Sequence, residues 1–263
     1  MGAAIVWILL AVVVSLGGLV LVRWAVTLDV LKEQHEVAGV AFAVLGGLYG
    51  IILAFVLVSS WERFETARGR ADFEASAAAD IYRHAQGFAD PLRADLGREV
   101  MAYLQSVVED EWPAMEQGEF SPKTQEIYKS IWRTVLESRP SENWEVVLYQ
   151  STLSKLDDFG DSRRTRLLYM HSGLPTVLWV FLIVFGAATV AFTYFFGMRH
   201  IVAHAIITGL LAATITSSLL LIDETQTPFS GGLHLSSRPF AFILAGLKRD
   251  SGIDPQAPDP PFD

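Results

Sequence analysis

Two histidines have the spacing of a possible metal site. His200 and His204 are four residues apart, which places both imidazoles on one face of a helix, where zinc could bind. No acid or third histidine follows within reach in the sequence, so two interfacial histidines near a helix start are the favoured interpretation. Asp157, Asp158 and the acidic run at 109–111 are typical of solvated helix faces. We therefore predict no metal site.

Sequence signatures of catalysis are missing from the chain. It contains no GxSxG nucleophile elbow, no phosphate-binding P-loop, no dinucleotide fingerprint and no HExxH zinc motif. The glycine-rich stretch at 46–50 lies inside an apolar segment, where glycine serves helix packing and not phosphate binding. The chain has no cysteine, which removes thiolate metal sites and thiol nucleophiles. We predict no catalytic residue, no cofactor and a protein that is not an enzyme.

Apolar residues make up 51% of the 263 residues and gather in two blocks, before Trp61 and after Leu167. A soluble domain would spread them along the chain, so this grouping indicates membrane segments. The net charge of −9 argues against nucleic acid, which is bound by clustered Lys and Arg. The expected partners are therefore membrane lipids and not nucleic acid.

Four uncharged or nearly uncharged segments are long enough to cross a bilayer, for which a helix needs about 20 residues. They cover 2–22, 37–60, 176–196 and 201–222. The second is rich in Gly and Ala, which let helices approach closely in lipid, and it runs without proline into a charged continuation. One long helix leaving the membrane is the simplest interpretation, and a plain anchor with a polar extension is the alternative.

The polar middle, 61–166, carries 14 of the 20 Lys and Arg residues and 20 of the 29 acids. Its apolar residues recur at three- and four-residue steps, which predicts helices throughout. We expect an all-α polytopic membrane protein with four transmembrane helices and a helical insert. The predicted parts are a first membrane pair (1–60), the insert (61–172), a second membrane pair (173–222) and a C-terminal segment with a disordered Pro-rich tail (223–263).

Orientation follows from the distribution of Lys and Arg, because basic loops stay in the cytoplasm. The 14 positive charges of the middle segment predict a cytoplasmic insert. Both termini then also face the cytoplasm. We expect a multi-pass protein of the bacterial inner membrane.

Two short stretches resemble the bestrophin family, and more closely its bacterial bestrophin-like branch of unknown function. Residues 60–68, SWERFETAR, follow the second span and look like the aromatic–Arg–Phe–acid–Arg segment after the second bestrophin membrane helix. We interpret four of its side chains as a structural clamp at the membrane exit: Trp61, Arg63, Phe64 and Arg68.

The second stretch, residues 223–231, reads DETQTPFSG and follows the fourth span. It is similar to the bestrophin segment in which acids precede Pro-Phe-Gly. It lacks the acid-rich run that follows in calcium-gated animal members, so the resemblance does not extend to calcium gating. The motif residues are Asp223, Glu224, Pro228 and Phe229. The two acids could cap the helix or lie at the membrane interface, and both roles are favoured over a ligand role.

Bestrophins are pentameric ion channels with a narrow apolar neck on their second helix. The resemblance implies that Gly47, Ile51 and Phe55 face that neck, although the family prefers a bulky residue where Gly47 stands. Leu48 and Ile52, together with Phe55, form an alternative face. These side chains could equally face lipid or pack within the bundle.

The resemblance thus implies a self-associating, homopentameric channel for monovalent ions, with a pore lined by the second membrane helix. A ring of Phe and Ile can gate such a pore by dewetting. The alternative function is a non-conducting membrane scaffold or sensor whose helical insert binds a partner.

Overall fold

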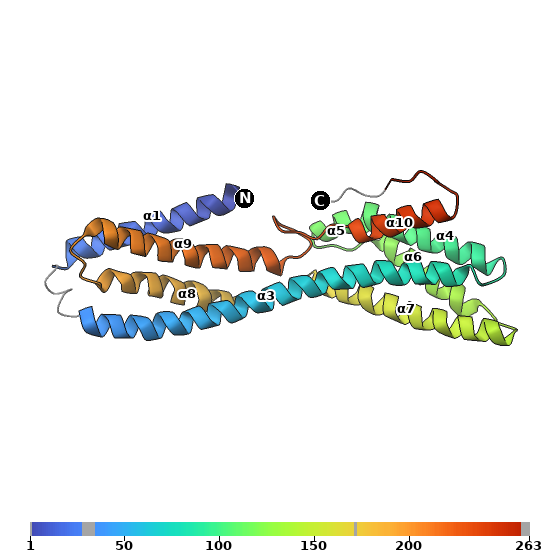
Figure 1. Ribbon diagram of the computed structural model, residues 1–263, viewed down its shortest axis with the longest axis horizontal. Coiled ribbons are helices and arrows are strands. Elements are labelled where there is room, and N and C mark those ends of the chain that lie inside the picture. Colours follow the sequence, from blue (N-terminus) through green and yellow to red (C-terminus); the bar gives the residue numbers. More distant parts are fainter. Residues whose placement is uncertain (1, 28–34, 171–172, 259–263) are drawn as a thin grey trace. The chain divides into compact units, whose positions relative to one another are not determined.

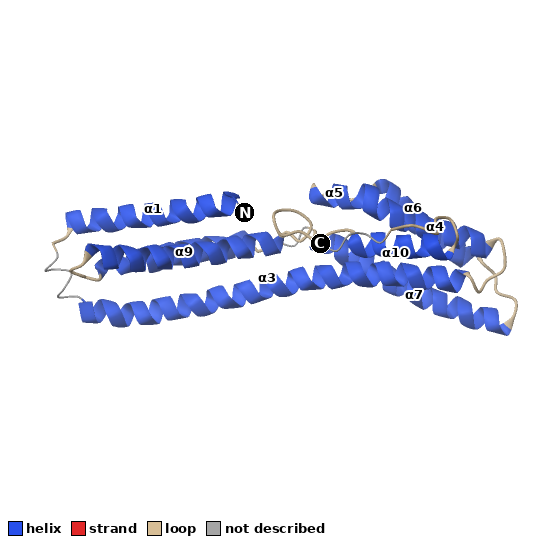
Figure 2. Ribbon diagram, turned by 45° about the horizontal axis from the view of Figure 1, so that its top comes forward, coloured by secondary structure: helices blue, strands red, loops and turns tan. Residues whose placement is uncertain are grey.

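The computed structural model describes residues 2–27, 35–170 and 173–258, and this part of the chain is helical without any strand (Figure 2). The prediction of an all-α protein is therefore confirmed. In chain order the elements are α1 (Gly2–Ala25), α3 (His35–Ala85), α4 (Leu92–Ser106), the π-helix η1 (Val107–Glu111), α5 (Trp112–Glu116), α6 (Pro122–Glu137), α7 (Asn143–Tyr169), α8 (Thr176–Phe192), the 3-10 turn η2 (Thr193–Phe195), α9 (Ile201–Gln226) and α10 (Arg238–Asp250) (Figure 1).

Two compact units share the chain, and α3 contributes to both. The first comprises residues 1–62 and 173–226, and the second comprises 63–172 and 227–263. The connection 28–34, which lies within the polar link predicted between the first two spans, and the end of the predicted tail, 259–263, lie outside the described residues.

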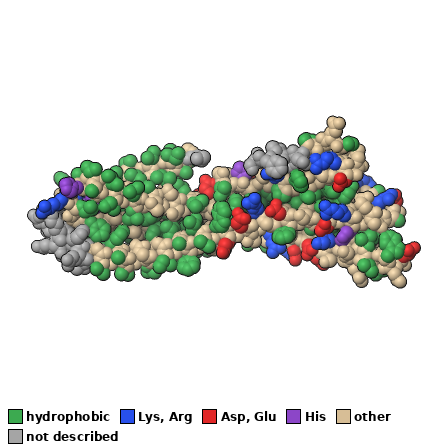
Figure 3. Space-filling view, viewed as in Figure 1, with side chains coloured by type: hydrophobic (Ala, Val, Ile, Leu, Met, Phe, Trp, Pro, Cys, Tyr) green, Lys and Arg blue, Asp and Glu red, His purple; other side chains and the backbone are tan. Residues whose placement is uncertain are grey.

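The first unit is a bundle of the four predicted spans. α1, the first part of α3, α8 with η2, and α9 are each long and apolar enough to cross a membrane, which confirms four transmembrane helices. In the view of Figure 3, apolar side chains cover these helices. A helix suits this setting because it satisfies all its backbone hydrogen bonds internally.

Close approach in this bundle depends on two glycines. A Cβ atom at Gly18 of α1 would lie 2.7 Å from the Tyr194 hydroxyl, and one at Gly186 of α8 would lie 2.7 Å from the Tyr49 hydroxyl. Any larger residue would therefore push the two tyrosines away. Lipid offers no hydrophobic drive for helix association, so such close packing is what holds membrane helices together.

The second unit packs α4, α6, α7 and α10 around the second part of α3. Small side chains recur along α3 on its buried face, which allows its neighbours to come close: Ala67, Ala71, Ala75, Ala78 and Ala85. α6 begins at Ser121-Pro122, where the Ser121 hydroxyl caps the helix by accepting a hydrogen bond from the Thr124 N–H at 3.2 Å. Charged side chains gather on the surface of this unit (Figure 3).

The helical path that begins with α4 does not end at Pro113, although a proline usually ends or kinks a helix. It continues through η1 into α5, in whose first turn Pro113 lies. The wider π-helical turn changes the hydrogen-bonding register just before the proline, and a first-turn residue needs no N–H. Gly118, with φ of +77°, follows the true end of the helix.

Two glutamates and two arginines form a buried ionic network in the second unit. Glu74 lies on α3, Glu111 on η1, and Arg163 and Arg166 on α7; their side chains are 0–3% exposed. The interpretation of 109–111 as a wholly solvated acidic run was therefore wrong for Glu111. The π-helical turn changes the direction in which successive side chains project, and it carries this carboxylate into the core.

Both oxygens of the Glu74 carboxylate and both oxygens of the Glu111 carboxylate accept hydrogen bonds. Arg166 donates from Nε to Glu74 Oε2 at 2.7 Å and from Nη2 to Glu74 Oε1 at 2.9 Å. Arg163 donates from Nη1 and Nη2 to the two oxygens of Glu111, at 2.6 and 2.9 Å. Tyr103 of α4 donates to Glu74 at 2.5 Å and accepts from Arg163 at 2.9 Å. The network thereby joins α3 and α7 to the continuous helical stretch of α4 and η1.

Replacement of Arg166 by Met should lower the free energy of unfolding by about 3–5 kcal/mol, because it leaves Glu74 buried without its arginine. Arg164→Met is the matched control: Arg164 pairs with Asp161 at the surface, with both side chains more than 60% exposed, and such pairs contribute about 1 kcal/mol or less. Thermal and urea unfolding of the full chain in detergent would measure both. Equal effects of the two substitutions would contradict a dominant role for the network.

Stability should also fall at alkaline pH through Tyr103. Burial and the neighbouring Glu74 carboxylate raise the pKa of Tyr103 well above its usual value. Above pH of about 10 the unfolded chain loses this proton while the folded protein keeps it, so stability falls by about 1.4 kcal/mol per pH unit. Urea unfolding between pH 9 and 11 should show this slope reduced in Tyr103→Phe. An unchanged slope in that variant would refute the assignment.

Candidate functional site

One face of the membrane part of α3 is fixed against α8. The Tyr49 hydroxyl donates to the Leu182 carbonyl oxygen at 3.0 Å, and Tyr49 is only 4% exposed. Gly186 leaves the space that its ring needs. On the same face, four apolar side chains pack against the bundle core: Ile52, Leu53, Val56 and Leu57. This contact determines which face of α3 is left uncovered within one chain.

The uncovered face carries the predicted neck residues. Phe55 is 72% exposed and Ile51 57% exposed, while Gly47 on the preceding turn has no atom within 4 Å of where a Cβ would be. Leu48 lies on the same side at 57% exposure, whereas Ile52 packs into the bundle. The structure therefore separates the two members of the alternative face and leaves Gly47, Ile51 and Phe55 together. Whether they line a pore stays a prediction.

The segment predicted as a membrane-exit clamp divides into different environments. Phe64 is buried in the core of the second unit, and Trp61 is 47% exposed. Arg63 is partly buried. Arg68 forms a surface ion pair with Glu65 at 3.8 Å. Phe64 thus has a packing role, and the joint clamp stays a prediction.

The residues of the motif after the fourth span also lie in different environments: its two acids belong to the first unit, and Pro228 and Phe229 to the second. Asp223 accepts a hydrogen bond from Gln226 Nε2 at 2.7 Å, and the Gln226 Oε1 accepts from the N–H of Leu174 at 3.1 Å and from Trp179 Nε1 at 3.3 Å. Asp223 thereby orients an amide that binds the start of α8. Glu224, the second acid, is partly exposed.

Pro228 and Phe229 belong to the second unit. The Pro228 carbonyl accepts from the Leu235 N–H at 2.8 Å. Phe229 is 2% exposed and packs edge-on against Trp112, with ring centroids 5.5 Å apart. The two residues therefore anchor the segment that leads into α10.

The two histidines do not converge on a metal site. His204 is buried and its Nε2 lies 2.8 Å from the Thr193 carbonyl oxygen, while its Nδ1 lies 3.5 Å from Arg23 Nη2. Arg23 also donates to the Met198 carbonyl. Among the residues that the structure describes, no group of three or more His, Cys, Asp or Glu side chains could hold a metal ion. The cluster serves to tie the ends of α1, α8 and α9 together.

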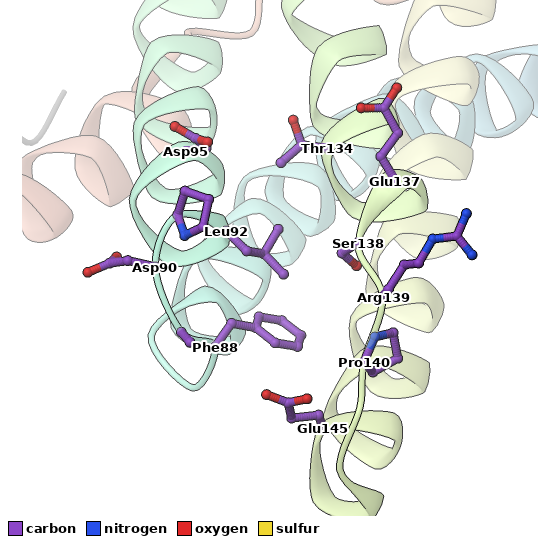
Figure 4. A pocket seen from close by; sticks show the side chains of 12 residues that line it. Phe88, Asp90, Leu92, Asp95, Thr134, Glu137, Ser138, Arg139, Pro140 and Glu145 are labelled. Atoms are coloured by element: carbon purple, nitrogen blue, oxygen red, sulfur yellow. The ribbon is translucent and has the colours of Figure 1, made fainter.

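A cavity of about 390 Å³ lies between the start of α4 and the connection from α6 to α7. Figure 4 shows Phe88 and Leu92 facing this connection, whereas the Asp90 carboxylate points away from it. Glu145 accepts hydrogen bonds from the N–H groups of Ser141 and Glu142, which lower its pKa. The acids here cap helices and pair locally, so this cavity offers no converging reactive groups.

Sequence reasoning singled out neither this cavity nor the buried network. Glu74, Tyr103 and Arg166 stand among many charged and aromatic residues of amphipathic helices. Only the contacts between distant helices distinguish them, and no local motif carries that signal.

Comparisons with known proteins agree with this fold. A model of the bestrophin-like domain matches residues 9–240. A crystal structure of a single-residue variant of a bacterial bestrophin homologue from Klebsiella pneumoniae is similar with a TM-score of 0.71 at 18% identity, covering 95% of this chain and 99% of that chain. Another variant of that homologue gives 0.73 at 17% identity, covering 94% and 98%.

A further crystal structure, described as that of a membrane protein, has a TM-score of 0.71 at 15% identity and covers 96% of this chain and 100% of that chain. No curated protein matches significantly. The resemblance seen in residues 60–68 and 223–231 is thus confirmed by a match that spans most of the sequence. With four membrane helices and this fold, the chain belongs to the bestrophin-like domain family.

Proposed function

We propose that this protein is the subunit of an oligomeric ion channel whose pore is lined by the uncovered face of α3 in the membrane. The observation that carries the proposal is the exposure of Phe55 and Ile51 in a segment whose opposite face is fixed by Tyr49. Several copies that turned this face to a common axis would form apolar rings. Such a constriction admits ions only when it is wetted, which gives it the properties of a gate.

The proposed assembly is a homopentamer in the bacterial inner membrane, with both termini in the cytoplasm and monovalent ions as the permeant species. The family match and the distribution of Lys and Arg support this arrangement. The chemistry proposed is transport and not catalysis.

Shortening the side chain at Phe55 should widen the constriction. We expect Phe55→Ala to raise single-channel conductance or open probability in planar bilayers, because the ring loses its bulkiest apolar group. Phe185→Ala is the matched control, since Phe185 is a 44% exposed phenylalanine on α8 that contacts Phe181. Wild-type protein and Phe55→Ala that were both silent above lipid background would refute conduction, and equal effects at the two phenylalanines would refute the pore assignment.

Subunit counting tests the assembly separately. Light scattering or native mass measurement in detergent should give about five times the chain mass of 29.0 kDa, after subtraction of bound detergent. A monomer or dimer would favour the alternative function, a non-conducting scaffold or sensor that uses its helical insert to bind a partner.

A further inference from the structure

The second unit contains another cavity, whose lining residues are of the kinds found in ligand sites. It has a volume of about 400 Å³ and lies between α6, α7 and the connection that precedes α6. Its apolar walls are formed by Phe120, Tyr128, Leu167, Leu168 and Met170. Pockets for small molecules have volumes of about 300–1,000 Å³ and combine mostly apolar walls with a few placed polar groups.

The polar residue of interest in the lining is Arg163, a buried arginine with one nitrogen that makes no hydrogen bond to any described residue. Arg163 is 2% exposed and lines the cavity, and its Nε has no hydrogen-bond partner among the described residues. Its Nη1 and Nη2 are held by Glu111, and Nη2 also donates to the Gln125 amide oxygen at 3.3 Å. A buried N–H without an acceptor is unfavourable, so Arg163 is a lining residue whose hydrogen bonding is incomplete among the described residues.

The charged side chains in the cavity lining are both positive, which suits an anionic ligand group. Two guanidinium groups, of Arg163 and Arg164, are among the lining residues, and none of the lining residues that the structure describes carries a carboxylate. The acids that pair with them, Glu111 and Asp161, are not part of the lining. Guanidinium groups bind carboxylates through strong charge-assisted hydrogen bonds.

We propose that this cavity binds a small carboxylic acid with an apolar body, whose carboxylate lies against Arg163 and Arg164 while its body lies against Phe120, Tyr128 and Leu168. The proposal is independent of whether the protein conducts ions.

The position of the Tyr128 ring in the cavity wall depends on Gly160. A Cβ at this position would lie 2.7 Å from the Tyr128 hydroxyl, so glycine lets the Tyr128 ring lie against α7. The ring also packs over the Arg163 guanidinium, 5.4 Å from its centroid. The wall and the donor are thus positioned by the same contact.

Isothermal titration of the full chain in lipid nanodiscs with 4-phenylbutyrate tests the proposal, with empty nanodiscs as the reference for partitioning. We expect saturable binding of one acid per subunit, and much weaker binding of the neutral 4-phenylbutanamide. Arg164→Gln should weaken binding by about tenfold, the effect of one charge-assisted hydrogen bond. Leu168→Glu should weaken binding at least as much, because it places a carboxylate at the rim.

Two matched substitutions control for surface effects. Arg98 pairs with Asp95 three residues earlier, as Arg164 pairs with Asp161, so Arg98→Gln should bind as the wild type does. Leu136 is 58% exposed and does not line the cavity, so Leu136→Glu should also have no effect. Absence of saturable binding to the wild type, equal binding of the amide, or equal losses in test and control variants would each overturn the proposal.

Discussion

The four buried charges of the ionic network restrict how the helices of the second unit can pack. Removing a carboxylate or guanidinium from water costs several kcal/mol per ion, and only close, hydrogen-bonded pairing offsets this cost. Glu74 and Arg166 are 92 residues apart in the sequence, so α3 and α7 must meet in one register for the pair to form. Tyr103 and Glu111 extend the same condition to α4 and η1. A slipped helix would leave a charge unpaired in the core.

Aromatic packing around the network strengthens this condition. The Arg166 guanidinium lies 5.5 Å from the ring centroids of both Trp112 and Phe240, which brings α5 and α10 against the ionic centre through cation–π contact. Trp112 in turn packs on Phe229, from the segment after α9. The Pro-Phe motif therefore acts on the network through one intervening ring, which gives this short sequence a structural role.

The membrane unit is held by different means. Hydrogen bonds between its helices include Tyr49 to Leu182, His204 to Thr193 and Trp179 to Gln226. Close contact at Gly18 and Gly186 adds further specificity. Because Tyr49 fixes one face of α3, the opposite face stays uncovered and apolar. The same logic operates at the proposed ligand cavity, where Glu111 holds Arg163 by two nitrogens and leaves the third unpartnered.

Local sequence patterns were enough to predict the helical class, the four spans and the family. These depend on local properties: runs of apolar residues long enough for a bilayer, periodic apolar stripes, and two short motifs at 60–68 and 223–231. Such signals are read within one segment and need no knowledge of neighbours.

Two features depend on contacts between distant segments: which polar residues are buried, and which face of α3 is covered. Glu111 looks like its solvated neighbours in the sequence, and only the π-helical turn and Arg163 distinguish it. Ile51 and Ile52 are equally apolar, yet only Ile52 packs on the bundle, because the Tyr49 contact fixes the rotation of the helix. Burial is a property of the residues that come to lie opposite, and these are distant in the chain.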